Sequence, residues 1–75
     1  MSVIEVSMTA GEILSALEQH AGNVPVEQLT SSRRCSRDAV LMALGWLFKE
    51  GFVSIHPGAG DWWIGLRNRT RQAGH

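Results

Sequence analysis

The sequence predicts a mainly helical α+β fold in which three helices are followed by a two-stranded antiparallel β-hairpin. Three observations predict it. Residues 36–50 open with a capping serine, contain an almost uninterrupted apolar run from Ala39 to Phe48, and are followed by a glycine. Residues 9–21 carry apolar side chains at the three- and four-residue spacing of an amphipathic helix. Residues 52–66 alternate in a strand-like way on both sides of a turn rich in Pro and Gly.

The length and composition predict a single domain over residues 1–75. A hydrophobic content of 44% is ordinary for a globular chain of 75 residues and too high for a disordered one. The single cysteine, Cys35, excludes an internal disulfide and suits a reducing compartment. The N-terminus lacks the features of a signal peptide, and the apolar run in the middle is too short to span a bilayer. We therefore expect a cytoplasmic protein without a membrane partner.

The first predicted helix covers residues 9–21. Thr9 and Glu12 have the spacing of a capping box, in which two side chains satisfy backbone N–H groups at a helix start. Gly22 provides the stop, because glycine tolerates the left-handed backbone of a helix end.

Residues 1–8 are predicted to form an N-terminal arm. Ser2 and Glu5 repeat the capping-box spacing, so the alternative is that the first helix begins there.

Pro25 separates the first helix from the second, which we predict over residues 26–32. Proline disfavours helical backbone at the preceding Val24, which leaves room for a very short strand at this point. Proline also suits the first turn of a new helix.

The third predicted helix covers residues 36–50. Ser36 is its N-cap, and Asp38 in the first turn complements the helix dipole. Gly51 ends it as a glycine C-cap. Its inward face is predicted to contain four apolar residues, Val40, Ala43, Leu44 and Leu47.

Residues 52–66 predict an antiparallel hairpin with a turn over residues 57–61. In the second strand the alternation puts Trp63 on one face and the other apolar side chains on the opposite face, namely Trp62, Ile64 and Leu66. The tail, residues 67–75, has no apolar periodicity and is predicted to be frayed.

The charges are unevenly distributed although the net charge is zero. Residues 1–32 contain four glutamates and no Lys or Arg, a net charge of −4. Residues 33–75 contain seven Lys and Arg against three acidic residues, a net charge of +4. Such asymmetry either marks a face that binds a polyanion or simply solvates a small surface.

The order helix, short helix, tight turn, longer helix and hairpin resembles a winged helix-turn-helix domain. Residues 24–66 carry the resemblance, above all the segment from Val40 to Val53 and the Trp62–Leu66 strand after the glycine turn. The segment ALGWLFKEG is similar to a family of small bacterial stand-alone winged-helix proteins of unassigned function. The resemblance implies the fold, but a fold alone does not carry a function.

The resemblance implies that the third helix contacts DNA with its first turn, because the second helix of the motif enters the major groove. We expect nucleic-acid binding or transcription regulation, with DNA held mainly through phosphate contacts made at this turn, at the wing and in the tail. The candidate residues are Arg33, Arg34, Ser36, Arg37, His56, Arg67 and Arg69. The alternative is that these side chains only solvate the surface.

The outward face of the same helix favours a second hypothesis, a protein-interaction or dimerisation module without sequence-specific DNA binding. It carries apolar side chains where a DNA-reading helix needs hydrogen-bonding groups. The candidate residues are Leu41, Met42, Trp46 and Trp63. The alternative is that the arm or the hairpin covers Met42 and Trp46.

The sequence contains no recognisable catalytic or metal-binding constellation. His20, His56 and His75 are dispersed, and Cys35 has no partner at metal-ligand spacing. We therefore expect neither an enzyme nor a bound metal or cofactor, and a partner that is DNA, another protein or a second copy.

Overall fold

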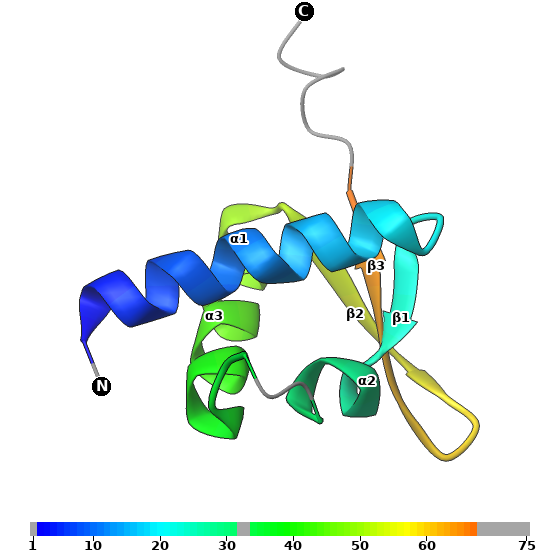
Figure 1. Cartoon of the computed structure of the whole chain (residues 1–75). Helices are drawn as coiled ribbons and strands as arrows, with labels where there is room; N and C mark the ends of the chain where they lie inside the picture. The colour runs from blue at the N-terminus through cyan, green and yellow to red at the C-terminus, as the bar shows by residue number, and fades with distance from the viewer. Residues whose placement is uncertain (1, 32–33, 68–75) are drawn as a thin grey trace, which may run out of the picture.

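The computed structural model describes residues 2–31 and 34–67. Within these ranges it contains α1 (Val3–Gln19), β1 (Asn23–Pro25), α2 (Val26–Thr30), α3 (Arg37–Glu50), β2 (Val53–Gly58) and β3 (Asp61–Leu66). Figure 1 shows α1 lying across α3 and the sheet, with the β2–β3 hairpin extending past α2. The predicted fold, three helices followed by a hairpin, is confirmed.

The start of α1 differs from the preferred prediction. The helix begins at Val3, and the Ser2 hydroxyl accepts a hydrogen bond from the Glu5 backbone N–H at 3.1 Å. Thr9 is not a cap: it lies inside the helix, is 2% exposed, and donates its hydroxyl to the Glu5 carbonyl at 2.8 Å. The predicted arm over residues 1–8 is therefore wrong from Val3 onward, and the helix uses the alternative start, with Ser2 as its N-cap.

The ends of the first two helices come earlier than predicted. α1 ends at Gln19, and left-handed backbone at Ala21 (φ 60°) and Gly22 (φ 85°) turns the chain. α2 ends at Thr30, with Ser31 as its C-cap. The predicted helix over residues 9–21 loses two residues at this end, and the one predicted over residues 26–32 ends at Thr30, with residue 32 outside the described residues.

Both ends of α3 follow the local signals that predict them. The Ser36 hydroxyl accepts from the Ala39 backbone N–H at 3.1 Å. Gly51 adopts φ 83°, and the Phe52 N–H donates to the Leu47 carbonyl at 2.9 Å, the bond pattern of a glycine-terminated helix. The predicted glycine end is confirmed, and the start is one residue later because Ser36 is the cap.

The sheet has the strand order β1-β3-β2, so β3 is its central strand and both pairings are antiparallel. The short strand predicted at Val24 is present as β1. It pairs with β3, and Val24 lies opposite Ile64. β2 continues to Gly58, which makes the turn shorter than the predicted residues 57–61.

The predicted alternation in β3 holds, but only its middle residue is buried on the core side. Ile64 is fully buried, whereas Trp62 and Leu66 lie near the strand ends and are exposed. Trp63 is half-buried on the opposite face, paired with His56, and a Cβ at Gly58 would overlap its indole ring. Gly58 therefore makes room for Trp63.

Asp61, at the start of β3, links the hairpin to α2. Its Oδ2 accepts from the Glu27 backbone N–H at 2.8 Å, and its Oδ1 accepts from the Trp62 N–H at 2.7 Å. Pro25, the N-cap residue of α2, has no side chain that could do this. The hairpin thus supplies the cap that α2 lacks.

The core lies between α1, α3 and the sheet. It is built from aliphatic and alanine side chains, mostly β-branched on the strands. Its buried members are Ala10, Ile13, Leu17, Val24, Leu29, Val40, Ala43, Leu44, Leu47, Val53 and Ile64.

Candidate functional site

The side of α3 that faces away from the core is apolar and open to solvent. We call it the α3 outer face and define it as Leu41, Met42, Gly45, Trp46 and Phe48. Leu41 is 42% exposed, Met42 58% and Trp46 51%. The alternative that the arm or the hairpin covers Met42 and Trp46 is therefore wrong.

Trp46 is held in place although half of it is exposed. Its ring stacks on the Phe52 ring with centroids 6.1 Å apart and an interplanar angle of 29°. Since an aromatic side chain fixed on one side loses little entropy when its free side is covered, Trp46 is suited to contact a partner.

An apolar groove continues the α3 outer face onto the start of α1. It has a volume of about 540 Å³ and is lined by Ser2, Val3, Val6, Met42 and Trp46. Val3 is 82% exposed, because the first turns of α1 extend past α3 (Figure 1). Val3 and Val6 are not among the site residues predicted from the sequence; the Ser2–Glu5 capping-box spacing was the signal that could have placed them in a helix.

The basic candidates that the structure describes belong to different segments of the chain. The Arg34 Nη1 donates to the Glu12 Oε1 at 3.0 Å in an exposed ion pair. Arg37 is exposed in the first turn of α3, next to the capping Ser36. Arg33 and Arg69 lie outside the described residues.

The other two candidates for DNA contact lie on the hairpin side of the domain. His56 is exposed on β2, and Arg67 follows β3, with its backbone N–H donating to the Phe52 carbonyl at 2.9 Å.

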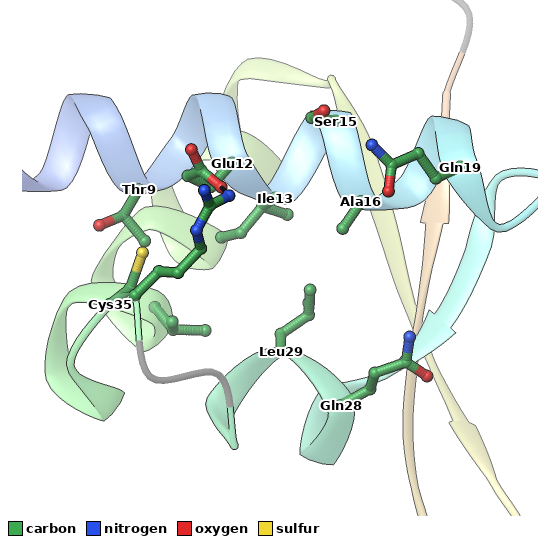
Figure 2. Close-up of a pocket in the computed structure, with 11 residues that line it drawn as sticks. Thr9, Glu12, Ile13, Ser15, Ala16, Gln19, Gln28, Leu29 and Cys35 are labelled. Carbon is green, nitrogen blue, oxygen red and sulfur yellow. Dashed lines mark hydrogen bonds and ion pairs between the residues drawn. The ribbon is translucent and has the colours of Figure 1, made fainter.

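A smaller cavity of about 250 Å³ lies between α1, α2 and the segment before α3. In Figure 2, Leu29 points from α2 toward α1, and the labelled residues of α1 include Thr9 and Glu12. Both polar side chains already have partners, since Thr9 donates to the Glu5 carbonyl and Glu12 pairs with Arg34. The cavity is also smaller than most ligand sites. It is therefore a weak candidate for ligand binding.

Near this cavity, the His20 ring makes hydrogen bonds with both of its nitrogens. Its Nδ1 lies 2.8 Å from the Ala16 carbonyl oxygen, which can only accept, so Nδ1 carries the proton. The Nε2 then accepts from the Gln28 side-chain amide at 2.9 Å. This bond ties the end of α1 to α2.

Within residues 2–31 and 34–67, no group of three or more His, Cys, Asp or Glu could hold a metal ion. None of the helices found there has the length and apolar character that crossing a bilayer requires.

Comparisons with known proteins agree with this architecture. A family model described as "Winged helix-turn-helix domain (DUF2582)" matches residues 1–66. The solution NMR structure of protein BT2368 from Bacteroides thetaiotaomicron, a structural genomics target, is similar with a TM-score of 0.69 and 26% identity, covering 96% of this chain and 84% of that chain. No curated protein matches the chain.

Proposed function

We propose that this chain, which belongs to the DUF2582 family of winged helix-turn-helix domains, is a non-enzymatic protein-interaction module. Winged helix-turn-helix folds often bind DNA, and the first turns of their third helix then lie in the major groove. In this protein the docking surface is instead the α3 outer face, together with the groove against the start of α1.

The observation that carries the proposal is the exposure of apolar side chains where base-reading groups would stand. Base edges in the major groove are read by hydrogen bonds from side chains such as Arg, Asn and Gln. Leu41 and Met42 offer no such group, and Trp46 offers only its indole N–H. A face of this composition gains more free energy against an apolar protein surface than against DNA.

The arrangement resembles the centre of a protein interface. Trp is enriched among residues that dominate binding energy, and such residues are surrounded by contacts that exclude water. Trp46 lies beside Met42 at the groove, while the exposed Lys49 and Asp38 supply polar groups on the same side of α3. We expect truncation of Trp46 to cost about 2 kcal/mol of binding free energy or more.

The test compares proteins captured by the wild-type domain with those captured by Met42→Asp and Trp46→Asp. The matched control is Trp62→Asp, since Trp62 is 55% exposed but lies on the hairpin. We expect a partner that binds wild type and Trp62→Asp and is lost from both α3 variants, with circular dichroism showing that all are folded. A partner retained by both α3 variants would contradict the proposal.

DNA binding is the second candidate, favoured by the exposed Arg37 in the first turn of α3 and by His56 and Arg67 near the wing. Such binding would rest on phosphate contacts and would weaken steeply with salt. A titration with duplex DNA at low and high salt tests it, using wild type and Arg37→Ala. Salt-sensitive binding that weakens in Arg37→Ala would replace the first proposal, whereas its absence at low salt removes the second.

A further inference from the structure

The face of the sheet opposite the core carries a row of polar side chains. The pairing places Asn23, Gly65 and Ser54 level with one another on β1, β3 and β2. Their neighbours Val24 and Ile64 are buried in the core, and side chains alternate along a strand, so this row lies on the other face. We call this face the sheet outer face and define it as Asn23, Ser54, His56, Trp63 and Gly65.

Gly65 lets three polar side chains converge on the sheet outer face. A Cβ added at this glycine would lie 2.8 Å from the Ser54 Oγ, 3.5 Å from the His56 Cε1 and 3.8 Å from the Asn23 Oδ1. Within residues 2–31 and 34–67, the structure gives none of these three side chains a hydrogen-bond partner. Their donors and acceptors are therefore available to a ligand.

Two rings lie beside this polar group, because the next row holds Trp63 between Pro25 and His56. Each ring lies against a glycine of the opposite strand. A Cβ at Gly58 would overlap the Trp63 indole, and the His56 imidazole reaches toward Gly65. Trp63 is half-buried and His56 is exposed, so both rings keep surface open to solvent. Rings with polar groups beside them are suited to stack on a planar ligand and to hydrogen-bond its edge.

The charge on this face favours an anionic ligand. Arg67 follows Gly65 by two residues, and its N–H donates to the Phe52 carbonyl at 2.9 Å, which extends the pairing with β2. Strand alternation then places the exposed Arg67 on the same face. The two rows around Gly65 contain no acidic residue. Asp61 lies at the turn, where its carboxylate accepts from two backbone N–H groups.

We propose that the sheet outer face binds single-stranded nucleic acid. Unpaired bases stack on Trp63 and His56. Asn23 and Ser54 hydrogen-bond the base edges, and Arg67 contacts the phosphate backbone. A duplex does not fit this site, because its bases are stacked on one another and are not free to cover a ring. The site leaves the α3 outer face free, so it goes beyond the proposed function.

Titration of isotope-labelled protein with an oligothymidylate of about eight nucleotides, followed by NMR, locates the site. We expect the Gly65 and Ser54 amides and the Trp63 indole N–H to shift, and the Trp46 indole N–H to stay in place. A duplex of the same length is the matched probe and is expected to leave these signals unchanged. The absence of shifts at millimolar oligothymidylate, or shifts confined to α3, would overturn the proposal. Shifts of the same signals by a proline-rich peptide, without any by the oligothymidylate, would also overturn it.

Variants separate stacking from misfolding. His56 is exposed, so His56→Ala is expected to keep the melting temperature and to weaken binding about fivefold, the lower end for loss of one stacked base. His56→Tyr keeps a ring and is expected to restore binding. Trp63→Leu is expected to weaken binding at least as much, and Trp62→Leu on the other face of β3 is its control. A His56→Ala variant that binds as the wild type does, or a folded Trp62→Leu variant that loses binding, would contradict the proposed site.

Two arginines separate this site from α3. Arg67→Ala is expected to lower the salt dependence of oligothymidylate binding by about one phosphate contact, and an unchanged dependence would contradict the contact. Arg37→Ala on α3 is expected to bind the oligothymidylate as the wild type does, and a loss there would move the site to α3. The capture experiment on Met42 and Trp46 does not involve the sheet, so the two proposals fail separately.

Discussion

Removing the carboxylate of Asp61 tests the link between the hairpin and α2. In Asp61→Ala the Glu27 and Trp62 backbone N–H groups both lose their acceptor, at 2.8 Å and 2.7 Å in the wild type. The first is an N-cap bond supplied from 34 residues away in the sequence. The variant is therefore expected to loosen a helix that lies far from it along the chain.

The expected size of the effect follows from these two bonds. Loss of an N-cap acceptor costs about 1 kcal/mol, and the second charge-assisted bond adds to it. Both N–H groups lie at the surface, where water replaces part of the loss, so we expect about 1.5 kcal/mol. Scaled to 75 residues, the unfolding entropy gives about 6 °C per kcal/mol, which predicts a melting temperature lower by ~9 °C.

Thermal unfolding by circular dichroism measures the total, and hydrogen exchange at the Glu27 amide measures the local part. Asp61→Asn is the matched variant, because its amide oxygen keeps one acceptor, and we expect about half the loss. A shift of less than 2 °C in Asp61→Ala, with unchanged protection at Glu27, would show that α2 does not depend on this cap.

Two glycines give predictions of opposite sign. Gly51 has φ 83°, a conformation that costs other residues about 1–2 kcal/mol, so Gly51→Ala should lower the free energy of unfolding by that amount in urea titrations. Gly45 lies inside α3 with nothing within 4 Å of an added Cβ, so Gly45→Ala should raise it by about 1 kcal/mol. A destabilised Gly45→Ala would mean that α3 is packed more tightly than its exposure indicates.

The sequence predicted the parts of the fold that depend on near neighbours. Ser36 and Gly51 delimit α3 because their hydrogen bonds reach only three to five residues. The choice between Ser2 and Thr9 could not be made in this way, because both precede a glutamate at the same spacing. Packing of Val6 and Ala10 on the core favours the earlier start, and that packing involves distant residues.

The candidate site was predictable in composition but not in exposure. The apolar character of Leu41, Met42 and Trp46 is visible in the sequence, whereas their exposure depends on how distant elements pack around α3. Trp63 was grouped with them, yet the pairing of β3 places it on the sheet, over Gly58. The cap from Asp61 joins residues that no local pattern relates.

The position of β3 in the sheet has a consequence for how the protein is made. β3 is the central strand, but it follows both of its partners in the chain. During synthesis α1 and α3 emerge first. Val24 and Val53 remain unpacked until Ile64 has emerged and can fill the space between them. Folding on the ribosome therefore cannot be completed helix by helix, because the sheet closes only after Leu66 has been released. Until then the nascent chain exposes apolar surface that a chaperone could recognise.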